Sequence, residues 1–135
     1  MPERSNEMDR RKILIIDDEG DFCNIVKENL ELRGSYEVYT TTNGKEGLKL
    51  AKKVKPDLIL LDIRMPEMDG FQVLERLKKE KDTMVIPVIM LSALDDDSSK
   101  VKGSQLYNEM YLTKPIKIVD LISSIEEVLK RRGAL

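Results

Sequence analysis

Short runs of apolar residues alternate along this chain with stretches of helical period. Residues 13–16, 58–61 and 86–91 are apolar at nearly every position. Continuous apolar runs of this length are typical of strands in a parallel sheet whose two faces are both covered by helices. Residues 36–40 and 110–113 form weaker runs that suit edge strands. The pattern therefore predicts five strands, the outer ones less apolar than the inner ones.

Amphipathic stretches lie between these runs, with apolar residues spaced three and four apart. The predicted buried stripes are Phe22, Ile25, Val26, Asn29 and Leu30; Leu48, Ala51 and Val54; Phe71, Leu74 and Leu77; and Ile118, Leu121, Ile122, Ile125, Val128 and Leu129. Asn43 is expected to cap the second helix and Asp69 or Gly70 to open the third. Gly34 and Pro56 follow the ends of the first two helices. This alternation predicts an α/β fold, an open parallel sheet with helices on both faces.

Charge and length narrow the class of protein. The 135 residues suit one domain, and 23 basic against 25 acidic residues give a net charge of -2. We therefore expect no binding to nucleic acid or to an anionic membrane by this chain. Its apolar runs are far shorter than the ~20 residues that span a bilayer. The polar start of the chain is unlike a secretory signal, and a single cysteine, Cys23, favours a cytoplasmic setting.

The chain contains no histidine. This excludes a Ser-His-Asp or Cys-His catalytic centre, a histidine-ligated zinc site and a phosphohistidine carrier. A lone cysteine also forms no internal disulfide. The chemistry must depend on carboxylates, hydroxyls, lysine or a hard cation.

Polar side chains follow four of the five predicted strands. They are Asp17, Asp18 and Glu19 after the first, Asp62 after the third, Ser92 after the fourth and Lys114 after the fifth. The carboxyl ends of parallel strands meet at one edge of the sheet, where ligands bind. Clustered carboxylates repel one another unless a cation neutralises them, and Mg²⁺ suits such oxygen ligands. A lysine and a hydroxyl there suit a phosphoryl group, so the set favours aspartyl-phosphate chemistry. Glu19 is interpreted only as a helix-start charge.

Four strings of residues carry a resemblance to a known family. They are residues 13–19, 57–70, 86–93 and 111–115. From Lys12 to Lys130 the chain resembles the response-regulator receiver domain of two-component signalling, in its chemotaxis-regulator-like form. The resemblance implies a flavodoxin-like, doubly wound (βα)5 fold with strand order 2-1-3-4-5. It covers the predicted receiver domain over 12–131, while the polar start of the chain predicts a flexible arm over 1–11 and residues 132–135 are expected to form a tail.

The resemblance further assigns roles to the acidic residues. It implies that Asp62 is the phosphoacceptor and that Asp18 and Asp62 bind Mg²⁺ directly. The backbone carbonyl of Arg64 would be a further ligand, and Asp17 would act largely through water.

The same resemblance assigns roles around the phosphoryl group. Ser92 would donate a hydrogen bond to it, and Lys114 would pair with one of its oxygens. The peptide bond between Lys114 and Pro115 would be cis, as an X-Pro bond permits. Tyr111 matches the switch aromatic that turns inward when the hydroxyl of Ser92 moves toward the phosphate.

The chain departs from the family in two regions. Arg64 and Leu94 stand where residues tune the lifetime of the phosphoryl group, and apolar Leu94 cannot orient an attacking water. We therefore expect slow self-hydrolysis. Tyr107 and Asn108 replace a common Gly-Ala pair, and residues 95–105 carry few apolar anchors. We expect a short or displaced fourth helix there.

These observations favour a phosphorylation-controlled binding module rather than an enzyme acting on other molecules. A sensor histidine kinase or a histidine phosphotransfer protein would supply the phosphoryl group. The face formed by the fourth helix, fifth strand and fifth helix would then bind a downstream protein or output domain. The chain would act as a stand-alone regulator or phosphorelay intermediate, as a monomer or a phosphorylation-dependent dimer.

Two alternatives stay open. The chain is the receiver half of a longer regulator if a DNA-binding output domain lies outside it. An aspartyl-phosphate phosphohydrolase of the haloacid-dehalogenase kind is the other alternative. Such enzymes typically carry a second Asp two residues after the nucleophile, and this chain has Arg64 there.

Overall fold

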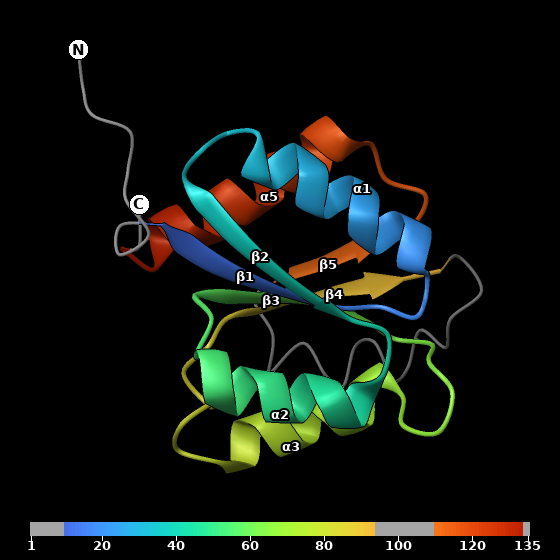
Figure 1. Ribbon diagram of the computed structural model, residues 1–135. Helices are drawn as coiled ribbons and strands as arrows, with labels where there is room; N and C mark the ends of the chain where they lie inside the picture. Colours follow the sequence, from blue (N-terminus) through green and yellow to red (C-terminus); the bar gives the residue numbers. More distant parts are fainter. Residues whose placement is uncertain (1–9, 94–109, 134–135) are drawn as a thin grey trace.

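The computed structural model describes residues 10–93 and 110–133 of the chain (Figure 1). Its strands are β1 (Arg11–Ile16), β2 (Tyr36–Thr41), β3 (Leu58–Asp62), β4 (Val88–Ser92) and β5 (Met110–Thr113). Its helices are α1 (Gly20–Glu31), α2 (Gly44–Val54), α3 (Gly70–Lys79) and α5 (Ile118–Arg131). All neighbouring strands pair in parallel, in the order β2-β1-β3-β4-β5. The predicted fold class and strand order are confirmed.

The sheet lies between two layers of helices. In Figure 1, α1 and α5 cover one face, and α2 and α3 cover the other. Alternate residues of β1 supply the two cores, because successive side chains on a strand point to opposite faces. Ile13 and Ile15 pack against α1 and α5, whereas Leu14 and Ile16 pack against α2 and α3. Double coverage explains why the central strands are apolar throughout.

Helix capping follows the sequence closely. The side chain of Asn43 accepts a hydrogen bond from the backbone N–H of Glu46 at 2.9 Å. Asp69 and Gln72 form a capping box at the start of α3, in which each side chain binds the other residue's backbone N–H. These contacts satisfy N–H groups that a helix start leaves without intrahelical partners.

Two details of the predicted elements are wrong. Ile25 is 49% exposed and does not belong to the buried stripe of α1, whereas Cys23, at 2%, does. The apolar run at 86–91 does not form a strand from its first residue, because β4 begins at Val88. Pro87 has no N–H to donate to a strand ladder. Its carbonyl still accepts a hydrogen bond from the backbone N–H of Ile59 at 3.0 Å.

Several predictions fall on other parts of the chain. The expected short fourth helix over 95–105, the pair Tyr107-Asn108 and Leu94 lie outside the described residues. Within 10–93 and 110–133, the helices are too short or too polar to cross a membrane.

Candidate functional site

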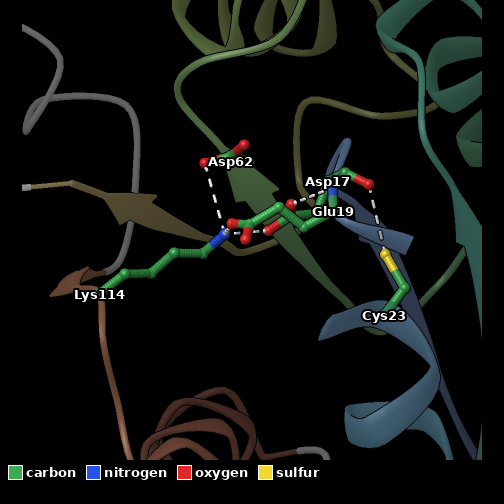
Figure 2. Close-up of polar contacts among 5 residues, drawn as sticks. All are labelled: Asp17, Glu19, Cys23, Asp62 and Lys114. Atoms are coloured by element: carbon green, nitrogen blue, oxygen red, sulfur yellow. Dashed lines mark hydrogen bonds and ion pairs between the residues drawn. The ribbon is translucent and has the colours of Figure 1, made fainter. Parts of the chain in front are cut away.

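The predicted site residues converge at the carboxyl edge of the sheet. Asp17 directly follows β1, Asp62 is the last residue of β3, and Lys114 directly follows β5. Backbone hydrogen bonds fix two of these strand ends: Asp17 N–H donates to Thr41 at 3.1 Å, and Lys114 N–H donates to Ser92 at 2.7 Å. Figure 2 shows the side chains of Asp17, Asp62 and Lys114 pointing toward one another. The parallel topology thus brings together residues that lie 97 positions apart in the chain.

Lys114 is the cation of the site. Its Nζ lies 2.7 Å from Asp17 Oδ2 and 2.6 Å from Glu19 Oε1, but 3.9 Å from Asp62 Oδ1. The same nitrogen lies 4.5 Å from the centre of the Phe22 ring, in cation–π geometry. Burial lowers the pKa of Lys114, but hydrogen bonds to Asp17 and Glu19 outweigh it and the net pKa is raised. The ammonium group therefore stays charged.

Three carboxylates form an acidic cluster beside this lysine. One oxygen from each of Asp17, Asp18 and Asp62 lies within 4.8 Å of the others. Asp17 is fully buried and Asp62 is 6% exposed, whereas Asp18 is exposed. Burial, followed by the charge of Asp17, raises the pKa of Asp62 to about 8. Burial also raises the pKa of Asp17 despite the hydrogen bond from Lys114.

This cluster fits a hard divalent cation. Its donors are all carboxylate oxygens, which Mg²⁺ prefers, and one of the three faces solvent. Burial and then the charge of Asp17 raise the pKa of Asp62 even though Lys114 lies nearby, so a further cation would favour its carboxylate form. The residues therefore have the chemistry of a magnesium site.

Contacts from α1 and the loop before it hold Asp17 in place. Its Oδ1 accepts a hydrogen bond from the backbone N–H of Glu19 at 2.9 Å. Its backbone carbonyl accepts one from Cys23 Sγ at 3.3 Å. Burial and then the charge of Asp17 raise the pKa of Cys23 to about 12, so this thiol is a packing group and not a nucleophile.

The remaining predicted residues lie near the same edge. Ser92 is the last residue of β4 and is 7% exposed. Arg64 is exposed in the loop after β3. The peptide bond between Lys114 and Pro115 is cis. Tyr111 pairs in register with Met90, packs against the core under α2 and α3, and has a buried hydroxyl oxygen.

Two residues contribute more to this edge than the sequence suggested. Glu19 reads as a helix-start charge, yet its side chain makes no capping hydrogen bond and pairs with Lys114 instead. Gly70 reads as a possible helix start, but a Cβ there would lie 2.3 Å from the carbonyl oxygen of Asp62 and 2.8 Å from Ile63 Cα. The helix therefore begins directly against the backbone of Asp62, an approach that only glycine allows. The sequence offers one signal for the contact between Glu19 and Lys114, namely the presence of an acidic residue two positions after Asp17.

Comparison with known proteins agrees with this arrangement. Residues 13–126 match the family described as "Response regulator receiver domain", and the chain belongs to that family. Its sequence is 38% identical to the alkaline phosphatase synthesis transcriptional regulatory protein PhoP of Bacillus subtilis strain 168, over 90% of this chain and 49% of that protein. The chain spans about half the length of the curated relatives it matches.

Solved structures show the same fold. The receiver domain of Francisella response regulator 1452 has 34% sequence identity and a TM-score of 0.79, covering 91% of this chain and 99% of that one. A CheY-like receiver domain protein from Methanospirillum hungatei JF-1 has 29% identity and a TM-score of 0.82, covering 92% and 97%. The chain is thus a receiver domain of two-component signalling.

Proposed function

We propose that this receiver accepts a phosphoryl group on Asp62 from a histidine kinase or a histidine phosphotransfer protein. The observation that carries the proposal is the position of Lys114 Nζ, which lies between Asp17 and Asp62 at the edge where three carboxylates meet. A buried carboxylate flanked by a cation and by metal-type ligands suits attack on phosphorus. The chain's own lack of histidine leaves that residue to the partner.

Asp17, Asp18, Asp62 and the backbone carbonyl of Arg64 would hold Mg²⁺, with Asp17 acting largely through water. When bound, the ion would neutralise the carboxylates and offset charge on the phosphoryl oxygens. These residues supply both the metal ligands and the acceptor.

In the transfer, a carboxylate oxygen of Asp62 forms a bond to phosphorus while the P–N bond of the partner's phosphohistidine breaks. The bonding electrons of that P–N bond stay with the partner's imidazole, which leaves as the neutral ring because its other nitrogen carries a proton during the transfer. Lys114 then pairs with a phosphoryl oxygen and Ser92 donates a hydrogen bond to another. Asp62 reacts as the carboxylate, so neutralisation of the cluster favours the reactive form.

The switch that follows would involve Ser92 and Tyr111. Movement of the Ser92 hydroxyl toward the phosphoryl group would leave room that favours the inward position of the Tyr111 ring, in which its hydroxyl oxygen is already buried. That shift biases an existing equilibrium between two arrangements of the partner-binding face. A downstream protein or output domain would bind one of these two arrangements more tightly than the other.

The test is Mg²⁺-dependent labelling of the purified chain by acetyl phosphate and by a phosphorylated histidine kinase. We expect a label on the protein that is stable in mild acid and labile in base. The label should be lost in Asp62→Asn and in the absence of Mg²⁺. Asp21→Asn is the matched control, because Asp21 is an exposed acid in the first turn of α1. Equal labelling of Asp62→Asn and wild type would overturn the assignment.

A second candidate is the receiver half of a longer transcriptional regulator. It is favoured by the match to about half the length of relatives such as PhoP and the DNA-binding dual master transcriptional regulator RpaA of Synechocystis. Sequencing the gene beyond the codon for Leu135 tests it. A continuing reading frame that encodes a DNA-binding fold supports this candidate, and a stop codon contradicts it.

The lifetime of the phosphoryl group is a further part of the proposal. Arg64 is exposed two residues after the acceptor, where its side chain is long enough to cover the site. We expect slow self-hydrolysis that Arg64→Ala accelerates, measured as loss of label with no phosphatase present. A half-life of seconds, unchanged by Arg64→Ala and Leu94→Ala, would contradict this.

A further inference from the structure

We propose that Glu19 and Phe22 are positioning residues that hold the Lys114 ammonium group away from Asp62 in the unphosphorylated protein. They thereby set how readily Lys114 pairs with a phosphoryl group. This inference rests on the proposed function of Asp62 and deepens it, since it concerns the regulation of the same site.

The distances show a competition for one cation. Lys114 Nζ lies 2.6 Å from Glu19 Oε1 and 3.9 Å from Asp62 Oδ1. An ammonium group has three N–H donors, and in this arrangement two of them bind Glu19 and Asp17. The acceptor carboxylate is therefore the most distant of the three acids that surround the lysine.

Glu19 and Asp17 hold the lysine in different ways. The side chain of Asp17 is fully buried, whereas that of Glu19 is 63% exposed. Water screens an exposed ion pair, so the contact with Glu19 is weak and easily exchanged. Glu19 also lies outside the three-acid cluster suited to a metal. It is thus a restraint on Lys114 that can be removed without deleting a predicted metal ligand.

Phe22 restrains the same nitrogen from α1. Its ring centre lies 4.5 Å from Lys114 Nζ, and the ring itself packs against the core that α1 and α5 share with the sheet. A ring held by packing presents a fixed face, which attracts the ammonium group through its π electrons. Both contacts therefore draw Lys114 toward the start of α1 and away from the end of β3.

To approach a phosphoryl group on Asp62, the ammonium group must move from its present position, 2.6 Å from Glu19 and 3.9 Å from Asp62, and this movement weakens the contact with Glu19. Removing that contact lowers the free energy that Lys114 needs to reach an anion on Asp62. We therefore expect Glu19→Gln to bind beryllium fluoride, a phosphoryl mimic, about threefold more tightly than wild type, the equivalent of one exposed ion pair. Phe22→Leu acts in the same direction, and Phe22→Tyr, which keeps a ring, restores wild-type affinity.

The first experiment is a beryllium fluoride titration at saturating Mg²⁺, followed by backbone amide NMR. Asp21→Asn is the matched control, because it removes the same charge from an exposed acid two residues further on. Tighter binding by Glu19→Gln with no change in Asp21→Asn supports the proposal. Equal effects in both variants, or weaker binding by Glu19→Gln, would overturn it. If wild type binds no beryllium fluoride, or Asp62→Asn binds it equally well, the proposed function itself fails.

The second experiment reads the position of Lys114 without any phosphoryl chemistry. Protons over the face of an aromatic ring shift upfield, so the ε-methylene signals of Lys114 should be upfield in wild type and in Phe22→Tyr. They should return to ordinary values in Phe22→Leu and, on addition of beryllium fluoride, in wild type. Ordinary values in unligated wild type would contradict the restraint by Phe22.

Discussion

Two aspartates at opposite ends of one strand have opposite surroundings. Asp57, just before β3, is half-buried; its carboxylate accepts a hydrogen bond from the backbone N–H of Lys12 at 2.8 Å, and its own N–H donates to Lys12 at 2.7 Å. Asp62, the last residue of β3, is buried beside Asp17, and burial raises its pKa to about 8. The first aspartate completes strand pairing, and the second is held where its charge is disfavoured.

This difference separates stability from chemistry within one sheet. At the amino edge, a carboxylate is matched by a backbone donor, so it contributes to the fold. At the carboxyl edge, acids lie close together with one lysine among them, and the repulsion is relieved only by a cation or by protonation. Functional edges of this kind are commonly less stable than the scaffold that holds them.

The largest effect is expected where α3 begins against the backbone of Asp62. Gly70→Ala should destabilise the protein by about 3 kcal/mol, because the added Cβ would overlap backbone atoms of Asp62 and Ile63. Gly20→Ala, at the start of α1, has no atom within 4 Å of its added Cβ and should be neutral or stabilise by up to about 1 kcal/mol. Urea unfolding of both variants measures the contrast. Equal stabilities of the two variants would mean that the backbone of Asp62 is not tightly packed against α3.

The two aspartates should respond to amide substitution in opposite directions. Without Mg²⁺ and above pH 8, Asp62→Asn should stabilise the protein by at least about 1.4 kcal/mol, the equivalent of one unit of pKa. Asp57→Asn should destabilise it by about 1 kcal/mol, because a charge-assisted hydrogen bond becomes a neutral one. Chemical denaturation in a metal chelator provides the measurement. Shifts of the same sign in both variants would remove the distinction between the edges.

The free energy of unfolding should depend on pH because the pKa of Asp62 differs between the folded and unfolded states. Its pKa is raised to about 8 in the folded protein, so the folded state binds the proton more tightly than the unfolded state does. The resulting stabilisation is complete below the ordinary aspartate pKa and is lost as the pH rises toward 8. Asp17, whose pKa is also raised, contributes with the same sign.

Saturating Mg²⁺ should remove this decline, since it stabilises the carboxylates. Thermal unfolding between pH 4 and 9, with and without Mg²⁺, measures both curves, and Asp62→Asn without Mg²⁺ should show a flatter one. A wild-type curve that rises with pH in the absence of Mg²⁺ would contradict the assignment.

The smallest effect is expected for charges at neither edge. Lys79 Nζ lies 3.0 Å from Glu75 Oε1 on the surface of α3, and these side chains are 71% and 66% exposed. Glu75→Gln should change stability by less than about 0.5 kcal/mol, because water already solvates both groups. It provides a baseline for the aspartate variants in the same denaturation experiment. A change as large as that of Asp62→Asn would show that burial is not the cause of the difference.

Much of the site could be predicted because topology determines it. Once alternating runs specify a parallel sheet, Asp17, Asp62 and Lys114 must lie at one edge, and the structure brings their side chains together. What a linear pattern does not contain is the direction of an individual side chain. An acid before a helix caps it or points elsewhere, and Glu19 points to Lys114.

The features that the sequence did not predict depend on local details of side-chain direction and backbone packing. Cys23 and Ile25 are two residues apart on α1, and the apolar pattern alone does not show which of them faces the sheet. In the structure Cys23 is buried and Ile25 is exposed. A glycine before a helix is common, so the close approach of Gly70 to Asp62 is visible only in three dimensions. The strand β4 begins after Pro87 for a reason that the sequence does contain, namely the missing N–H.

The most direct test of the contrast between the two edges is the titration of the Asp62 side-chain carboxyl carbon by ¹³C NMR, with and without Mg²⁺. Without Mg²⁺ we expect a pKa of about 8, because burial and the charge of Asp17 disfavour the carboxylate. With saturating Mg²⁺ the pKa should fall by several units. A pKa in the ordinary aspartate range without Mg²⁺, unchanged when Mg²⁺ is added, would contradict the account.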